Sequence, residues 1–360
     1  WNTTKDLLMK TTIASSSGYS YQYKNMGQTS NKGVELQLDA VLVDAKDFGL
    51  NFNFNISYNR GKIDKLNGSS FWQSSSWAGT AAAGIEDFLV EEGGRLGEVY
   101  GYKTDGFYTA DDFTFDAEKG TYALKAGVND CSSLIGGKVY PGSIKLKANE
   151  DGEYKKERLG NTVPTVSGGF GLNARWKGFD FTAFFNYSLG NKIVNATKLG
   201  SSFYSGSSKN WNINDHFTSA NRYSWIDPST GTNLLSSASI KANGEAWTIN
   251  RLNEVNTGSS IWNPAAATVM PLVDWAVEDG SFLRVNNITI GYTLPKLFVS
   301  KLNIQNIRIY VTGYNLHCFT KYSGTDPEVD CCTSTPMTPG IDYAAYPKSR
   351  SFVGGINVTF

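Results

Sequence analysis

A stretch of strictly alternating apolar and polar residues, from position 50 to position 59, constrains the fold of this chain more than any other feature. A β-strand points successive side chains to opposite faces, so a period of two predicts a strand with two unlike faces. The apolar positions are Leu50, Phe52, Phe54, Ile56 and Tyr58, and the polar positions are Asn51, Asn53, Asn55, Ser57 and Asn59.

The alternating pattern recurs along the chain and predicts about eight strands in all. Segments of this kind cover 33–43, 49–59, 168–176, 179–189, 286–294, 307–315 and 352–360, with a partial strand over the first eight residues. Aromatic residues make up 13% of the chain and glycine is abundant, a mixture typical of many short strands joined by turns. The predicted fold class is therefore all-β.

The connections between these strands are alternately short and long. Short ones follow 33–43, 168–176 and 286–294, and the second of these is only Lys177–Gly178. The long ones cover about 10–32, 60–166, 190–280 and 317–350. Outer-membrane barrels show this asymmetry, with short periplasmic turns and long extracellular loops, whereas a soluble sandwich has no reason to place every long loop at one end. We therefore predict a transmembrane antiparallel β-barrel.

Aromatic residues gather near the predicted strand ends. Tyr58 and Tyr187 fall toward the outer rim, and Trp176, Phe179, Tyr292 and Phe360 fall toward the inner rim. Amphipathic rings are favoured at both membrane interfaces, which favours a girdle over ordinary core packing. Eight strands can close a small barrel, but connections as long as 60–166 are unusual on one. We therefore expect a larger barrel with further strands on the N-terminal side.

Charge composition limits the possible partners. Thirty-three basic and 33 acidic residues cancel to a net charge of zero, whereas a nucleic-acid-binding domain shows a basic excess. No run of 18 or more apolar residues predicts a transmembrane helix, but a transmembrane strand needs only about ten alternating residues. The chain begins at Trp1 without a signal peptide, and we interpret it as a fragment or a processed chain.

The cysteines and the acidic loop residues are the candidates for a disulfide or a metal site. The four cysteines, Cys131, Cys318, Cys331 and Cys332, fit no zinc-binding spacing, and the sequence leaves both a loop disulfide and free thiols open. Asp326, Glu328 and Asp330 carry oxygens that suit a structural calcium ion. Pro327 breaks the ligand spacing, so a solvated loop is the favoured interpretation and no cofactor is predicted.

The sequence offers little that predicts an enzyme. It has two histidines, His216 and His317, and no nucleophile-elbow motif. The run Gly169-x-Gly171-x-x-Ala174 matches a dinucleotide-binding fingerprint in its letters, but the segment alternates as a strand and no helix follows. We expect no catalytic residues.

Aromatic residues in the long connections are the candidates for substrate contact, because their rings can stack on sugars or pack on a partner. These are Trp72, Trp77, Tyr102, Tyr108, Trp211, Trp225 and Tyr322. The alternative, packing of the loops on themselves, is equally well supported by the sequence.

The last predicted strand resembles the signal that the barrel-assembly machinery reads. Its alternate positions are apolar and it ends in an aromatic residue. The residues concerned are Phe352, Ile356, Val358 and Phe360.

Several motifs in the second half of the chain resemble one family. They are 277–292 (VEDGSFLRVNNITIGY), Asn315-Leu316, 320–324 (TKYSG), 326–329 (DPEV), Tyr346-Pro347 and Arg350-Ser351-Phe352. Upstream, 31–35 (NKGVE), 101–106 (GYKTDG) and 160–164 (GNTVP) match in the same order. Together they resemble the SusC-like (RagA-like) TonB-dependent transporters over nearly the whole chain. His317-Cys318 and Cys331-Cys332 depart from that pattern.

The resemblance implies a 22-stranded barrel in a bacterial outer membrane, of which residues 1–360 form the C-terminal part. The plug domain, the TonB-contacting segment and the N-terminal strands are expected outside this sequence. The resemblance also implies a SusD-like surface lipoprotein as partner, active import of oligosaccharides or oligopeptides, and a Bacteroidetes-type host.

Three alternatives stay open. A passive porin-like channel would show the same strands without a plug or partner. An outer-membrane enzyme would need paired catalytic groups at the rim. A soluble carbohydrate-binding β protein would not need apolar outer faces.

Overall fold

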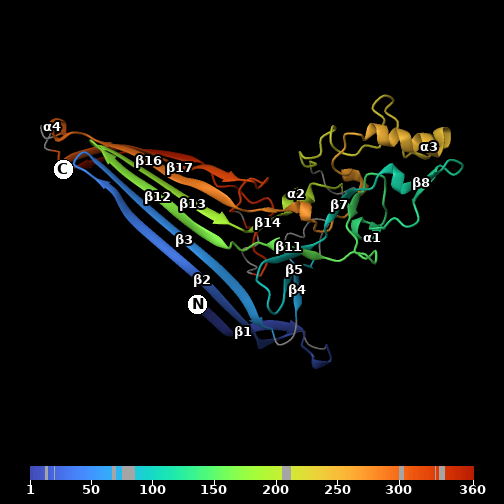
Figure 1. Cartoon of the computed structure of the whole chain (residues 1–360), viewed down its shortest axis with the longest axis horizontal. Coiled ribbons are helices and arrows are strands. Elements are labelled where there is room, and N and C mark those ends of the chain that lie inside the picture. The colour runs from blue at the N-terminus through green and yellow to red at the C-terminus, as the bar shows by residue number, and fades with distance from the viewer. Residues whose placement is uncertain are drawn as a thin grey trace.

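The computed structural model describes residues 1–12, 15–19, 21–66, 70–74, 86–204, 212–299, 304–328, 330–331 and 337–360. It has two parts (Figure 1). A long twisted antiparallel sheet, here called the wall, extends to one side, and a body built from the long connections lies at the opposite end. The predicted all-β fold is confirmed.

The wall has eight strands in the order β1-β2-β3-β12-β13-β16-β17-β19, and each strand pairs with its neighbours antiparallel. Every predicted strand is present, and most are longer than predicted. The wall strands are β1 (Asn2–Thr12), β2 (Tyr21–Asp44), β3 (Phe48–Lys65), β12 (Val166–Trp176), β13 (Phe179–Leu189), β16 (Phe282–Thr293), β17 (Asn306–Thr320) and β19 (Ser351–Thr359).

The long connection predicted over 10–32 is wrong. The pairing of β1 with β2 continues from Asn2 opposite Asn31 to Thr12 opposite Tyr21, so most of this segment is an extended hairpin. Its residues are largely polar, and their one alternating stretch, Tyr19, Tyr21 and Tyr23, is short. Backbone pairing requires no apolar face, and period-two patterning therefore identifies only the part of a strand that has one buried or lipid-facing side.

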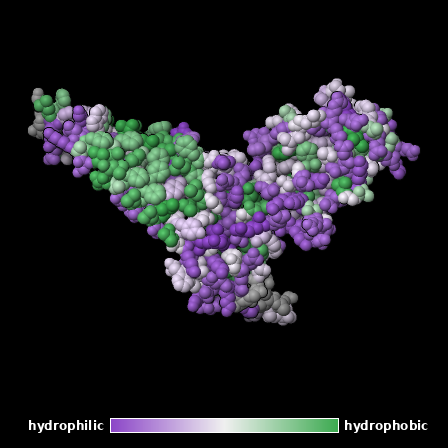
Figure 2. All heavy atoms as spheres, in the orientation of Figure 1, coloured by the Kyte–Doolittle hydropathy of each residue, from purple (hydrophilic) through white to green (hydrophobic). Residues whose placement is uncertain are grey.

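The apolar face of the wall is exposed. Val34, Leu36 and Ile290 each show more than half of their surface to solvent, and Leu38 shows 49%. A band of hydrophobic side chains covers the sheet between more polar ends (Figure 2). An exposed apolar area this broad marks a surface that another apolar medium covers.

A row of large apolar residues, aromatic on four neighbouring strands, crosses this face near the short turns. The pairing register aligns Phe48, Trp176, Phe179, Tyr292, Ile309 and Ile356 on six neighbouring strands. The ring centroids of Phe179 and Tyr292 are 4.5 Å apart, and Trp176 is 54% exposed. These exposures contradict the core-packing alternative and match the predicted inner rim.

The polar face of the wall carries amides, hydroxyls and a few ion pairs. Asp180 on β13 and Arg308 on β17 form an ion pair of 2.5 Å across the strand between them. Gly291 on that strand makes the contact possible, because a Cβ there would lie 2.5 Å from Asp180 Oδ1 and 2.6 Å from Arg308 Nη2.

Three long loops connect the wall strands at one end: the first loop (66–165), the second loop (190–281) and the third loop (321–350). The opposite end has the turn 45–47, Lys177–Gly178 and the connection with α4 (Lys296–Val299). In Figure 1, α4 and the C-terminus lie at that end. The predicted alternation of short and long connections is therefore confirmed for every connection after β2.

The loops contain short elements of their own. The strands are β4 (Phe71–Ser74), β5 (Glu86–Val90), β6 (Glu98–Gly101), β7 (Thr104–Phe107), β8 (Phe113–Asp116), β9 (Thr121–Leu124), β10 (Ile144–Leu146), β11 (Glu157–Asn161), β14 (Lys192–Asn195), β15 (Val277–Asp279) and β18 (Ile341–Asp342). The helices are η2 (Ala110–Asp112), α1 (Ser132–Ile135), α2 (Ala196–Gly200), α3 (Ser237–Val255), η4 (Pro264–Ala266) and η5 (Asp274–Ala276), and η1 (Ser15–Ser17) lies between β1 and β2. None of the described helices is long and apolar enough to cross a membrane.

The loops share one hydrophobic core. Phe88, Tyr108 and Ile144 of the first loop pack in the same cluster as Leu252 of the second loop and Ile341 of the third. Strand β14 pairs with β15 within the second loop and with β18 of the third. The loop body is thus a folded unit held by its own core, and the interior of the chain lies here rather than in the wall.

Candidate functional site

Arg284 is the central residue where the third loop meets the wall. It lies on β16 opposite Asn186, on the polar face, and its side chain is 4% exposed. Its Nη2 is 2.5 Å from Asp326 Oδ1 and its Nε is 2.5 Å from Glu328 Oε2. The same guanidinium donates to the side-chain oxygen of Asn315.

The Arg284 cluster, defined as Arg284, Asn315, Asp326, Glu328 and Lys348, holds both ends of the third loop. Lys348 Nζ lies 2.8 Å from Glu328 Oε2, and Asn315 Nδ2 donates to the Lys348 carbonyl at 2.7 Å. Asn315 has a φ of 50°, a left-handed conformation that asparagine tolerates well. The cluster therefore joins two wall strands to the loop that follows them.

The solvated loop that we expected around Asp326 is wrong. Asp326 is 3% exposed, and it accepts hydrogen bonds from Arg284 and from the backbone amide of Glu328. A buried carboxylate must be paired, and Arg284 supplies the opposite charge and one charge-assisted hydrogen bond through Nη2. Within the described residues, no group of three or more His, Cys, Asp and Glu side chains could hold a metal ion.

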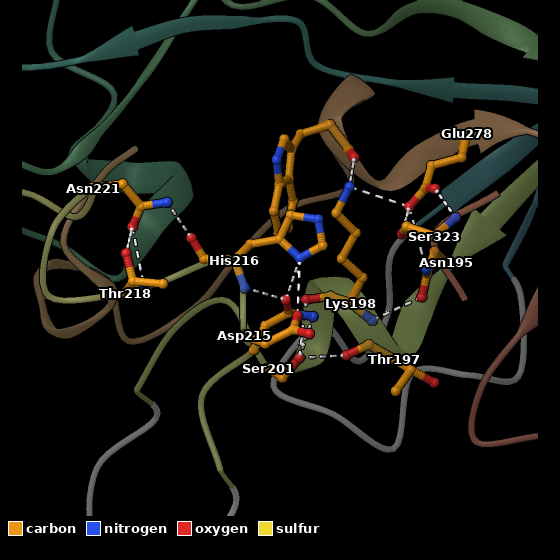
Figure 3. Close-up of polar contacts among 12 residues, drawn as sticks. Asn195, Thr197, Lys198, Ser201, Asp215, His216, Thr218, Asn221, Glu278 and Ser323 are labelled. Carbon is orange, nitrogen blue, oxygen red and sulfur yellow. Dashed lines mark hydrogen bonds and ion pairs between the residues drawn. The ribbon is translucent and has the colours of Figure 1, made fainter. Parts of the chain in front are cut away.

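An ion pair within the second loop, between Lys198 and Glu278, lies where Glu278 also contacts Ser323 of the third loop (Figure 3). Lys198 on α2 is 8% exposed, and its Nζ lies 3.1 Å from Glu278 Oε1 and 3.0 Å from the Trp275 carbonyl. It also sits 4.0 Å from the centroid of the Trp275 ring. Glu278 accepts from the Ser323 amide at 2.8 Å and from the Ser323 hydroxyl at 2.7 Å.

The electrostatics of Glu278 follow from these contacts. Burial acts to raise its pKa, but the hydrogen bonds from Ser323 and the charge of Lys198 outweigh burial, so the pKa lies below its usual value. A carboxyl whose pKa is lowered by folding stabilises the fold above its unfolded pKa, about 4.3, and this contribution is lost as the pH falls through the folded pKa.

We expect Lys198→Met to weaken the contact between the second and third loops by about 1–3 kcal/mol, because Glu278, which accepts from Ser323 of the third loop, loses its charged partner. The acid-induced opening of this contact should also move to higher pH, since Glu278 then needs less acid to become protonated. Protease cleavage within 321–350, followed from pH 7 to pH 3, measures both effects. An acid midpoint identical to that of the wild-type protein would contradict this account.

A polar cavity of about 380 Å³ lies beside this contact, between the second and third loops. Asn214, Asp215 and His216 line one side, and Asp342 and Tyr346 belong to the other. His216 Nδ1 is 3.2 Å from Asp215 Oδ1, and its ring stands edge-on to Trp275 at 5.9 Å. Tyr346 is 89% exposed. The cavity offers hydrogen-bond donors and acceptors beside one exposed ring, which suits a neutral polar ligand.

The predicted substrate-contact aromatics do not converge on this cavity. Tyr108 and Tyr322 are buried, where Tyr108 donates to the Asn129 carbonyl and Tyr322 to Asp342 Oδ2. Tyr102 and Trp225 are half-buried against the loop core. Tyr108 and Tyr322 thus pack inside the loop body, while Tyr102 and Trp225 keep part of their surface exposed, and contact with a substrate stays a prediction.

The remaining predicted residues lie elsewhere. Trp72 on β4 is 37% exposed and sits between the edge of the Tyr100 ring and the Lys156 ammonium. Trp77 and Trp211 lie outside the described residues. The predicted assembly-signal residues Phe352, Ile356 and Val358 face outward on β19, and Phe360 follows its last residue. Their role in assembly stays a prediction.

Of the cysteines, Cys131 and Cys318 are free thiols, Cys331 is exposed, and Cys332 lies outside the described residues. Cys131 is buried beside Tyr108 in the loop core, where burial raises its pKa. It behaves there as a small apolar residue.

Sequence reasoning missed Arg284, Lys198 and Tyr346 as structural or site residues. A single cation inside a strand or a loop gives no pattern, and its partner lies 42 residues away for Arg284 and Asp326. The motif letters around 284, 315 and 326–328 did carry a signal. The structure explains this signal, because those residues contact one another in one buried cluster.

Comparison with known proteins gives the context for this geometry. No family model matches the chain. The TonB-dependent receptor P3 of Formosa agariphila is 29% identical over 363 residues, which cover 99% of this chain and 31% of that protein. The chain resembles TonB-dependent receptors throughout. The TonB-dependent receptor SusC of Bacteroides thetaiotaomicron is 23% identical over 99% of this chain and 29% of its own length.

Solved structures agree on the fold. The RagAB peptide importer in its open-open state aligns with a TM-score of 0.62 at 22% identity, covering 99% of this chain and 32% of that chain. A second structure, of the RagAB peptide transporter, gives a TM-score of 0.59 at 23% identity. The predicted resemblance to SusC-like and RagA-like receptors and the predicted barrel fold are confirmed. The chain spans about a third of the length of the relatives it matches.

Proposed function

We propose that residues 1–360 form the C-terminal part of an outer-membrane receptor that imports oligosaccharides or oligopeptides with energy delivered through TonB. A plug domain, further N-terminal strands and a TonB-contacting segment would belong to the longer protein. A SusD-like surface lipoprotein would be its partner at the loop end. The likeness to TonB-dependent receptors over 99% of the chain supports this assignment.

The observation that carries the proposal is the division of the chain into a one-sided apolar wall and a polar loop body at one of its ends (Figure 2). A lipid-facing barrel requires an apolar outer face and accepts a polar inner face. The loop body then lies at the mouth of the barrel. Its polar cavity offers hydrogen-bonding groups, which are what selective capture requires.

The ionic contacts give the loop body a specific part in this function. The Arg284 cluster ties the third loop to the polar face of the wall, and the hydrogen bonds from Ser323 to Glu278 tie the third loop to the second. A mouth built this way presents its polar cavity in a fixed geometry. Preorganised sites bind with less loss of conformational entropy than mobile loops do.

The experiment begins with gentle detergent extraction of the native outer membrane and mass spectrometry of what co-purifies with this chain. A longer polypeptide with an N-terminal plug and a stoichiometric surface lipoprotein is expected. Solute uptake is then compared in cells with and without a functional TonB. Uptake that is independent of TonB, by a protein without plug or lipoprotein, would replace this proposal with a passive porin-like channel.

A further inference from the structure

A second cavity, of about 430 Å³, lies where the wall meets the first and third loops. Asn2, Asn31 and Asn59 line it from β1, β2 and β3. The register pairs Asn2 with Asn31 and Asn31 with Gly61, so these positions share the polar face with the asparagines of β3. The cavity is therefore on the inner side of the wall.

Arg95 of the first loop lines the same cavity. Two backbone hydrogen bonds fix the segment before Arg95 against β3. The Ile63 amide donates to the Gly94 carbonyl at 2.9 Å, and the Gly93 amide donates to the Ile63 carbonyl at 2.8 Å. On the far side, the Thr162 amide donates to the Gly97 carbonyl at 2.9 Å. Arg95 thus projects from a segment that is held at both ends.

The guanidinium of Arg95 is unpaired within the part of the chain that the structure describes. Among the described residues it makes no hydrogen bond and no ion pair within 4.0 Å, and the described lining of the cavity includes no Asp or Glu. The nearby Glu98 is already engaged by Arg158 at 2.9 Å. An arginine normally meets a carboxylate or phosphate through its planar fork.

The surroundings of Arg95 further disfavour its charged form. Partial burial and the charge of Arg60 lower the pKa of Arg95. Hydroxyl and amide side chains, among them Thr4, Thr29 and Asn31, line the remaining surface. An oxyanion bound in the cavity would offset the unbalanced charge and could accept further hydrogen bonds from these groups.

We propose that this cavity is an oxyanion-binding site in which Arg95 holds a sulfate, phosphate or carboxylate group of the imported solute. The volume suits such a group with one sugar ring or one amino-acid residue attached. The assignment of the anion to a solute rests on the proposed function, whereas binding of the anion does not.

Equilibrium dialysis measures the binding of radiolabelled inorganic sulfate to the purified full-length receptor in detergent. Ionic strength is held constant, with chloride as the background anion. One saturable site is expected. Arg95→Gln should weaken binding by about 10-fold or more, and Arg95→Lys should weaken it less, because lysine keeps the charge and loses the fork. Arg350→Gln, which removes an exposed arginine at the end of the third loop, should leave binding unchanged.

Folding of each variant is checked by the shift in gel mobility on heating, and Arg95→Gln should fold because Arg95 makes no hydrogen bond or ion pair with the described residues that the change would break. Equal sulfate binding by Arg95→Gln and wild type would overturn the proposal, and so would the absence of saturable binding to wild type, which is the result if a carboxylate of the longer protein fills the site. The TonB comparison is read separately. TonB-dependent uptake without sulfate binding defeats the Arg95 site alone, and sulfate binding without TonB dependence defeats the importer alone.

Discussion

Replacing Arg284 with methionine is expected to release the third loop from the wall at a cost of about 3–5 kcal/mol, the largest effect of any single change considered for this chain. Asp326 is 3% exposed, and in the variant it and Glu328 would lie against the wall without the guanidinium that pairs both. Methionine keeps much of the side-chain volume, so the loss is electrostatic rather than a cavity. Limited proteolysis of the full-length protein in native membranes, with mass spectrometry of cleavage sites within 321–350, measures the release.

Two further variants separate the cluster from general effects. Arg284→Lys keeps the charge but contacts one carboxylate at a time, and an intermediate cleavage rate is expected. Lys155→Met removes the cation of an exposed pair with Glu153 in the first loop, where solvent replaces the partner, so little or no change is expected. If the third loop of Arg284→Met resists protease as well as that of wild type, the cluster does not anchor it.

Leu38→Arg on β2 is expected to destabilise the membrane-inserted barrel by about 2–4 kcal/mol. Leu38 lies midway along the apolar face, opposite Phe54, and is 49% exposed in this chain. In lipid, an arginine there would have to be dehydrated or reach toward the interface. On a soluble protein, the same change at a half-exposed site would have almost no effect. Urea unfolding of the full-length protein in lipid vesicles measures the difference.

Gln37→Arg is the matched control, because residue 37 is adjacent and faces the other side of the same strand. It lies opposite Asn55 and beside Asp39, to which Gln37 already donates at 3.0 Å. An arginine on this face contacts carboxylates and polar groups, so the stability of the Gln37→Arg protein should stay close to that of wild type. Equal stability of the two arginine variants would mean that neither face of the wall contacts lipid.

Arg284→Met and Leu38→Arg test two different kinds of stabilisation in the same chain. The wall has little interior of its own, and its apolar residues point away from the protein. The loop body has an ordinary packed core, with Tyr108, Ile144 and Leu252 fully buried. The loop body is therefore expected to depend on core packing and ion pairs, and the wall on the surrounding lipid and on pairing between strands.

The amino-acid sequence by itself determined the wall. A period of two is a local signal. Each strand shows one face to an apolar medium and the other to a polar one, so adjacent residues alternate between apolar and polar. The segment 179–189 was predicted with the bounds that β13 has, and the short connections on either side of it follow from the same pattern. Where the medium on both faces is polar, as in the first half of β2, the signal disappears although the strand continues.

Only the tertiary structure decided the loops and the sites within them. Arg284 meets Asp326 across 42 positions, and Thr104 donates to Asp274 across 170, so no local pattern records either contact. The role of the aromatic candidates was ambiguous for the same reason, because contacts between distant segments decide whether a loop ring is buried. The sequence does not distinguish a buried ring such as Tyr108 from an exposed one such as Tyr346. Burial in the loop body depends on which segments meet, and that is settled only when all three loops have folded together.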